Sequence, residues 1–155
     1  MARPRLSGAL LGVALAVSGC ASMGGGALVP PSLAGSSWIA ESVDGQGMVG
    51  RPPITLTFEN AERAVGSTGC NRYFAAVRMS ERARLRFGQP GSTRMACPPA
   101  VMEQEQRFLV AIEAVRSYRL DGTSLVLFDE QRIARVRLLR APRGSATGLP
   151  GPSGS

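Results

Sequence analysis

The sequence contains no histidine, no lysine and few aromatic residues, with one Trp, two Tyr and five Phe among 155 residues. Without histidine, a serine triad of the usual type has no general base. Zinc normally takes four ligands, and three cysteines without histidine make a poor set. The few aromatic residues are not interleaved with basic ones, as a stacking platform for nucleic acid would require. We therefore expect no cofactor, no metal and no nucleic-acid partner.

All 18 basic residues are arginine, against 11 acidic residues, and the formal net charge is +7. A basic balance suits nucleic acid, acidic lipid headgroups or lipopolysaccharide phosphates. The exclusive use of arginine is better explained by the codon composition of the genome than by selection for phosphate contacts. We interpret the charge as a solvated, mildly basic surface.

The apolar run at the N-terminus is too short to span a bilayer, which takes about 20 residues. It extends from Leu6 to Val17 and follows Arg3 and Arg5. A basic start, a short apolar stretch and small residues before a cut site are typical of a secretory signal. We therefore interpret residues 1–19 as a signal peptide.

The end of this run, Val17-Ser18-Gly19-Cys20, resembles the bacterial lipobox. The resemblance implies that the Cys20 thiol receives a diacylglyceryl group, that cleavage precedes Cys20 and that its new amine is acylated. Stable anchoring needs several acyl chains, since a single chain binds membranes only marginally. Ala21 rather than Asp after the cysteine favours the outer membrane, so we expect a lipid-anchored protein at its periplasmic face. The alternative is an ordinary signal peptide with a coincidental cysteine.

Two segments rich in Gly, Ser and Pro flank the part of the chain that is expected to fold. Residues 20–34 include Gly24 to Gly26, and residues 141–155 have the same composition. Such segments cannot bury enough apolar surface to order themselves. We expect lipidated Cys20 with a flexible tether at 20–34, one domain at 35–140 and a disordered tail at 141–155.

Alternation of apolar and polar residues predicts short strands, as in Ile54–Phe58, where Ile54, Leu56 and Phe58 face one side. The other expected strands are Trp38–Val43, Arg63–Thr68, Tyr73–Met79, Leu85–Phe87, Tyr118–Leu120, Leu125–Phe128 and Ile133–Leu139. Pro98 and Pro99, followed by apolar residues at helical spacing, predict one helix that ends near Val115. The predicted fold class is α+β: a small antiparallel β-sheet or partly open barrel with one helix over an open face or end.

Two sequence blocks, Gly66–Tyr73 and Ser92–Cys97, stand out, together with Trp38 and the strand Thr55–Phe58. They closely resemble the META domain family, the HslJ-like group of small bacterial envelope proteins and lipoproteins. The resemblance implies a compact antiparallel β structure with one helix, and a pair of cysteines that tend to occur together. It also implies a link to heat-shock response, antibiotic tolerance and motility or virulence. No catalytic reaction is attached to the family.

Cys70 and Cys97 are expected to form a disulfide, because the chain is exported to an oxidising compartment and lipid consumes Cys20. The bridge would close a loop of about 27 residues and contribute roughly 3–4 kcal/mol. The alternative is a redox-active thiol at Cys97, which lies just before a helix start, where thiol pKa values fall. The two cysteines do not form a C-x-x-C motif, which disfavours redox catalysis.

Two further patterns invite a functional interpretation. Residues 45–50 match the dinucleotide fingerprint G-x-G-x-x-G, but prolines and a strand follow instead of a helix, so we interpret them as a loop. Glu103 and Glu105 lie two residues apart on a helix and point about 200° away from each other. They therefore cannot act together on one substrate atom.

The polar residues beside the expected bridge, Asn71, Arg72 and Arg94, form the cluster with binding potential. Ser92, Thr93 and Arg94 are interpreted as a turn whose side chains bond local backbone, with Arg94 available to pair with an acid. We favour a structural role for Arg72 and Arg94 over a binding role, because embedded arginines often tie loops together.

These observations predict a non-enzymatic lipoprotein of the outer envelope, involved in envelope stress or antibiotic tolerance and acting as a protein-interaction module. The alternative is a lipid or other apolar-ligand binding protein, with its cavity at the open end of the β structure under the helix. A third hypothesis, an enzyme that uses Cys97, requires a free thiol.

Overall fold

The computed structural model describes residues 33–142 of the chain. Its elements are, in order, β1 (Ser37–Val43), β2 (Gln46–Gly47), β3 (Thr55–Phe58), β4 (Arg63–Ser67), β5 (Arg72–Ser80), β6 (Arg84–Phe87), β7 (Gly91–Ser92), α1 (Pro99–Ala114), β8 (Ser117–Asp121), β9 (Ser124–Phe128) and β10 (Ala134–Arg140). Every predicted strand and the predicted helix are present, with bounds that differ by about one residue. The strands β2 and β7 were not predicted, because two residues are too few to show alternation.

The packed domain reaches slightly beyond the predicted bounds of 35–140. Leu33, assigned to the tether, is fully buried in the core. At the other end, the Ala141 amide donates to the Ser37 carbonyl at 2.8 Å. The predicted signal peptide, Cys20, the rest of the tether and the tail from residue 143 lie outside the described residues.

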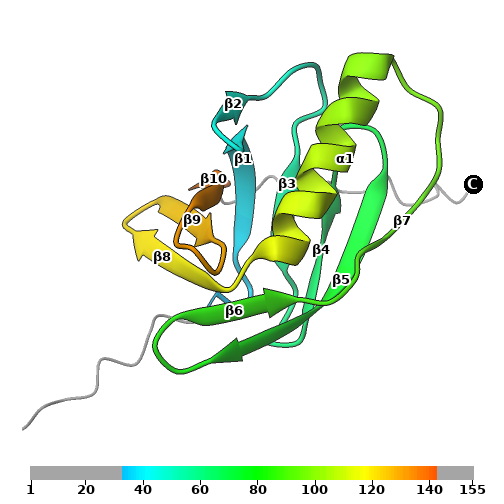
Figure 1. Ribbon diagram of the computed structural model, residues 1–155. Coiled ribbons are helices and arrows are strands. Elements are labelled where there is room, and N and C mark those ends of the chain that lie inside the picture. The colour runs from blue at the N-terminus through cyan, green and yellow to red at the C-terminus, as the bar shows by residue number, and fades with distance from the viewer. Residues whose placement is uncertain (1–32, 143–155) are drawn as a thin grey trace, which may run out of the picture.

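The strands form one antiparallel sheet in the order β10-β9-β8-β6-β5-β4-β3-β1-β2, with β7 paired to β5. β10 also pairs with β1, from Trp38↔Arg140 to Val43↔Val136, so the sheet curls round on itself. β6 and β8 are joined only through one residue pair, Arg84↔Ser117. The fold is a mostly antiparallel sheet with a single helix and is not a closed barrel, in agreement with the predicted α+β class (Figure 1).

The core lies between the inner face of the curled sheet and helix α1. Trp38 and Phe58 point inward from β1 and β3 and are fully buried. Phe108, Ala111 and Ile112, at helical spacing on α1, are fully buried in the same core cluster. Figure 1 shows the helix crossing one side of the sheet, from the loop after β7 to the start of β8. Within residues 33–142, no helix is long and apolar enough to cross a membrane.

The space under the helix was the predicted place for an apolar ligand, as the alternative function. Side chains occupy this space: Phe108 packs edge-on against Tyr73 with ring centroids 5.3 Å apart, and Ile112 beside it is fully buried. Within the described residues, a large open cavity lies instead on the outer face of the sheet.

Candidate functional site

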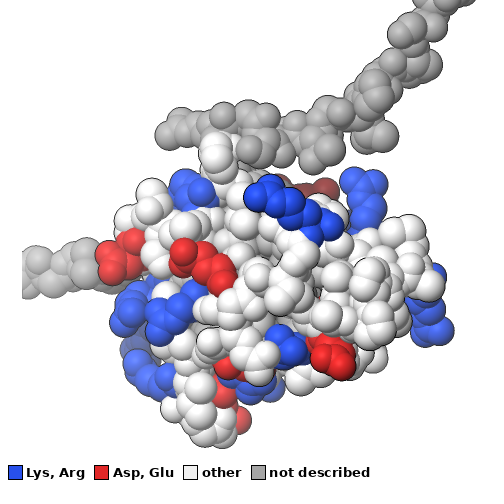
Figure 2. Space-filling view, turned by 90° about the horizontal axis from the view of Figure 1, so that it is seen from above, with Lys and Arg blue, Asp and Glu red and all other residues white. Residues whose placement is uncertain are grey.

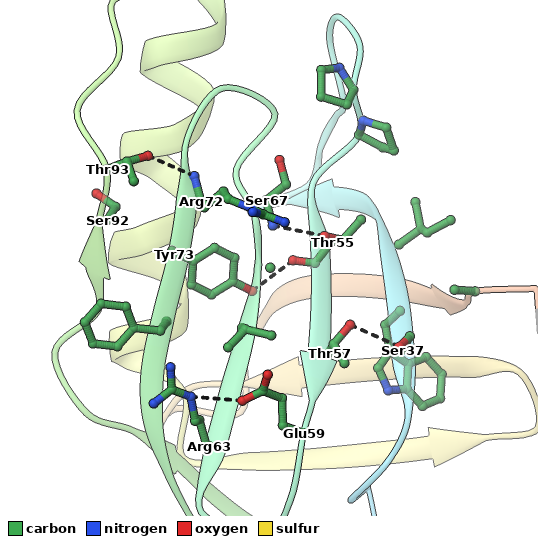
Figure 3. A pocket seen from close by; sticks show the side chains of 18 residues that line it. Ser37, Thr55, Thr57, Glu59, Arg63, Ser67, Arg72, Tyr73, Ser92 and Thr93 are labelled. Atoms are coloured by element: carbon green, nitrogen blue, oxygen red, sulfur yellow. Dashed lines mark hydrogen bonds and ion pairs between the residues drawn. The ribbon is translucent and has the colours of Figure 1, made fainter. Parts of the chain in front are cut away.

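A groove with a volume of about 1090 Å³ crosses the outer face of β1, β3, β4 and β5. We call it the outer groove; it is formed by outward-facing side chains of these strands and by Ser92 and Thr93 (Figure 3). Its polar lining is rich in hydroxyl groups, from Ser37, Thr55, Thr57, Ser67, Ser92 and Thr93. Its apolar floor includes Ile39, Val65 and Phe74. Hydroxyl and apolar groups therefore alternate across one open surface.

Strand alternation explains why threonines line the outer groove. In β3, Leu56 and Phe58 are buried inside, so Thr55 and Thr57 must point outward. Thr57 Oγ1 donates to Ser37 Oγ on the neighbouring strand at 3.0 Å. The alternating sequence of β3 thus supplies apolar side chains to the core and threonines to the outer groove.

The backbone pairing between β3 and β4 is interrupted beneath the outer groove. The Tyr73 hydroxyl donates to the Thr55 carbonyl at 2.9 Å, and the Ser67 amide donates to Thr55 Oγ1 at 3.0 Å. A Cβ on Gly66 would collide with the Thr55 carbonyl and would lie 2.8 Å from Tyr73 Cε1. The missing side chain of Gly66 therefore lets Tyr73 reach this gap from the inner face. Burial raises the pKa of Tyr73, so its phenol stays a neutral donor.

The two ends of the outer groove differ in charge. At one end, Arg63 Nε lies 2.9 Å from Glu59 Oε2, and the Arg63 guanidinium lies 5.6 Å from the Phe74 ring centroid. At the other end Arg72 is exposed, and within the described part of the chain it has no ion pair (Figure 3). A ligand in the groove therefore meets one uncompensated cation.

Asn71, predicted as a member of the polar cluster, is the centre of a buried network behind the groove. Its Oδ1 accepts from Thr93 Oγ1 at 2.9 Å and from the Met95 amide at 2.7 Å. Its Nδ2 donates to Glu105 Oε2 at 2.9 Å. Asn71 itself is only 4% exposed. The network holds the segment before α1 against the start of β5.

Glu105 was not predicted as a site residue and was considered only together with the exposed Glu103. Glu105 is 9% exposed and also accepts from Thr68 Oγ1 at 2.8 Å. Among residues 33–142 it has no cationic partner, so hydrogen bonds take the place of water around the carboxylate. Its spacing to Phe108 and Ile112 on the buried helix face is the signal that could have found it.

Cys70 and Cys97 form the predicted disulfide, with Cα atoms 6.2 Å apart. The bridge joins the loop before β5 to the residues that precede α1. With its sulfur in the bridge, Cys97 offers no free thiol in this structure.

The predicted cluster of Asn71, Arg72 and Arg94 is brought together only in part. The Arg72 amide donates to Thr93 Oγ1 at 3.1 Å, which links Arg72 to the Asn71 network. Arg94 is exposed, does not line the outer groove and has no ion pair within the described residues. The Thr93 hydroxyl bonds the Asn71 side chain and the Arg72 amide, both far away in sequence, so the prediction that it bonds local backbone is wrong.

Gln104 is a second residue that sequence analysis missed. It is 1% exposed, its Oε1 accepts from the Val49 amide at 2.7 Å, and its Nε2 donates to the Val49 carbonyl at 3.2 Å. These two bonds attach residue 49 of the glycine-rich motif to α1. No helix follows the motif, as predicted, but it is only partly a loop, because its residues Gln46–Gly47 form β2 and pair with β1.

The groove offers hydroxyl donors and acceptors, an apolar floor and the Arg72 guanidinium. The Glu105 carboxylate, in the network behind the groove, is hydrogen-bonded by Asn71 and Thr68, and the Glu59 carboxylate in the groove is paired with Arg63. In the described part of the chain, no group of three or more His, Cys, Asp or Glu residues could hold a metal ion.

Comparisons with known proteins agree with this fold. The NMR structure of a protein from Burkholderia xenovorans is 26% identical, with a TM-score of 0.56 over 72% of this chain and 85% of that one. A second NMR structure, 21% identical with a TM-score of 0.56, matches over 69% of this chain and 90% of its own and supports the fold alone. A search of the curated proteins finds no match. Because the META domain sequence model matches residues 31–142, most of its length, the chain belongs to the META domain family.

Proposed function

We propose that the chain is a lipid-anchored envelope protein whose META domain binds a segment of a partner protein in the outer groove, without catalysis. The observation that carries the proposal is the groove itself, about 1090 Å³ of open surface with hydroxyl groups, an apolar floor and unpaired Arg72. An extended peptide presents backbone amides and alternating side chains, which match such a lining.

The chemistry of the chain supports a binding role over a catalytic one. The sequence has no histidine to act as a general base near neutral pH. Two of the three cysteines are joined to each other. The envelope location is proposed from the signal-like N-terminus and the lipobox resemblance at Cys20. Metabolic labelling with palmitate should mark the chain, and Cys20→Ser should abolish the label; a labelled Cys20→Ser protein would contradict the anchor.

Site-specific photocrosslinking in living cells tests the groove. Thr57 lies in the middle of the outer groove, so a photoreactive amino acid there should crosslink to a distinct partner protein. The matched control is Thr123, an exposed residue in the turn between β8 and β9. Arg72→Gln should weaken the Thr57 adduct, because it removes the uncompensated cation. Identical adducts from both positions, or adducts with lipid alone, would contradict the proposal.

A role in envelope stress or antibiotic tolerance is part of the same proposal, as the META resemblance suggests. Deletion of the chain should increase sensitivity to envelope-active antibiotics. Complementation with the native chain should restore growth, and complementation with an Arg72→Gln chain should restore it only in part. Full rescue by a chain that no longer crosslinks at Thr57 would show that binding in the outer groove is not needed for antibiotic tolerance.

A lipid or other apolar ligand is the second candidate, favoured by the apolar floor of Ile39, Val65 and Phe74. Phe74 is 54% exposed, which is a large exposure for an aromatic side chain. Native mass spectrometry of the chain without its anchor should then show a retained acyl species. A protein that is consistently free of acyl ligand would favour binding of a partner peptide instead.

A further inference from the structure

Several exposed arginines lie on the outer face of β5, β6 and β8, next to the outer groove. The exposed residues Arg78 on β5, Arg84 and Arg86 on β6, and Arg119 on β8 all point outward. Arg82 in the turn between β5 and β6 is also exposed. We call these five residues the arginine face.

The centre of the arginine face is a direct cross-strand pair of like charges. Arg78 on β5 is paired in register with Arg86 on β6. Like charges directly opposite each other destabilise a sheet. Within the described residues neither arginine has an ion pair, and the nearby acid Glu81, in the turn, bonds neither of them. The face therefore carries positive charge that the protein itself leaves uncompensated.

The residues paired with Arg84 on either side are uncharged. Figure 2 shows the end of the domain away from β6, where arginines and acidic residues are interspersed. On β6 the outward residues are both arginine, and the pairs Ser80↔Arg84 and Arg84↔Ser117 place only serines beside Arg84. An anion approaching β6 thus meets several cations, and the exposed acids near them are Glu81 in the turn before β6 and Asp121 at the end of β8.

β6 lies at the end of the domain where the chain enters it. Figure 1 shows β6 at the same end of the molecule as the start of β1. Inside the core at this end, the Phe58 and Phe87 ring centroids are 6.1 Å apart, and the Gly35 amide donates to the Phe58 carbonyl at 2.7 Å. If Cys20 is anchored as proposed above, the segment up to Leu33 spans at most about 45 Å, which keeps this end within reach of the bilayer.

We propose that the arginine face docks on the phosphate headgroups of an anionic bilayer. Guanidinium groups bind phosphate oxygens through two parallel hydrogen bonds, and arginine is the preferred residue for this contact. Phosphates lying between Arg78 and Arg86 would relieve their repulsion. Docking would hold the domain in one orientation on the membrane, with the outer groove available to a partner.

Vesicle binding by residues 21–155 tests this docking without the anchor. All the core residues lie between Leu33 and Leu138, so this chain keeps the whole folded domain. It should bind vesicles of phosphatidylglycerol and phosphatidylcholine at low salt, and should not bind phosphatidylcholine alone. Arg78→Gln/Arg86→Gln should lower the partition coefficient about 30-fold, from about 1 kcal/mol per arginine near an anionic surface.

The matched control removes the same charge elsewhere. Arg51 and Arg94 are exposed and lie outside the arginine face, so Arg51→Gln/Arg94→Gln should lower binding far less. Arg78→Lys/Arg86→Lys keeps the charge and should retain most of the binding. An equal loss in both glutamine pairs, or equal binding to both vesicle types, would overturn the proposal. So would preferential binding of soluble polyphosphate or nucleic acid over vesicles. Thr57 crosslinking does not depend on this face, so failure here leaves the groove proposal standing.

Discussion

At the scale of single residues, Asn71 connects parts of the chain that lie far apart in sequence. It joins the loop before β5 to Met95, in the segment before the helix, and to Glu105, on the helix itself. An asparagine supplies both an amide donor and a carbonyl acceptor, so one side chain can serve an amide and a carboxylate at once. Its position next to Cys70 places the network and the disulfide together.

Asn71→Ala should lower the free energy of unfolding by about 3 kcal/mol. The substitution leaves the Met95 amide without its acceptor and the buried Glu105 carboxylate without its amide donor. Urea unfolding followed by circular dichroism measures the change. Asn60→Ala is the control, because Asn60 Oδ1 accepts from the Glu62 amide in an exposed turn. Equal losses for both variants would contradict the role assigned to Asn71.

The buried phenol of Tyr73 predicts a loss of stability at alkaline pH. Burial raises the pKa of Tyr73 above that of a tyrosine in the unfolded chain, about 10. The stabilisation is therefore complete below about pH 10 and declines above it by about 1.4 kcal/mol per pH unit, since only the unfolded chain then loses the proton.

Tyr73→Phe checks this origin of the pH dependence. It should reduce the alkaline slope and, at neutral pH, cost about 1 kcal/mol through loss of the bond to the Thr55 carbonyl. Burial also raises the pKa of Tyr118, so part of the slope should remain. An unchanged slope in urea titrations between neutral and alkaline pH would contradict the assignment.

At the scale of elements, the junction of β3 and β4 determines the shape of the outer groove. Side-chain bonds from Tyr73 and to Thr55 replace backbone pairing where Gly66 faces Thr55. The gap thus combines a glycine on β4, a tyrosine on β5 and a threonine on β3. Each residue belongs to a regular strand, and the gap in backbone pairing exists only because the three residues lie together in the folded sheet.

Gly66→Ala should destabilise the domain by about 3 kcal/mol. The new methyl group would collide with the Thr55 carbonyl, and would also lie 2.8 Å from Tyr73 Cε1. Gly47→Ala is the matched control, because a Cβ on Gly47 meets nothing within 4 Å. Thermal unfolding of the two variants should differ clearly, and similar midpoints would contradict the packing argument.

At the scale of the whole molecule, the disulfide limits how far the unfolded domain can expand. The bridge between Cys70 and Cys97 closes a loop with a sequence separation of 27. A closed loop of about this length stabilises the folded state by roughly 3–4 kcal/mol, mainly by restricting the unfolded chain.

Replacing both bridged cysteines, Cys70→Ser/Cys97→Ser, should lower stability by about 3–4 kcal/mol, and reductant should have no further effect on that variant. The native chain should lose the same amount when reductant is added. Thermal unfolding with and without dithiothreitol measures both. Equal midpoints for native and double-variant chains under oxidising conditions would contradict the predicted contribution.

Sequence patterns predicted the elements well because those patterns are local. The alternation in Ile54–Phe58 predicts both the strand and the direction of its threonines. Pro98 and Pro99 at the start of α1 and the apolar spacing to Ile112 predict the helix in the same way. The bounds of β2 and β7 were not predictable, since such short strands exist only through their partners β1 and β5.

The candidate site was only partly predictable. Asn71 and Arg72 were identified from their place beside the cysteines, whereas Arg94 stays outside the network. Glu105 and Gln104 were missed, because polar residues on a helix are expected to face solvent unless a partner is known.

By itself, the sequence determined the family and the order of strands and helix, because motifs and periodicity are properties of neighbouring residues. The pairing of Cys70 with Cys97 was predicted because they are the two cysteines of the folded domain. Only the tertiary structure decided that the hollow lies outside the sheet rather than under the helix, where Phe108 fills the space. It also decided that Arg78 and Arg86 face each other. The physical reason is that such contacts depend on strand register and curvature, which no local segment specifies alone.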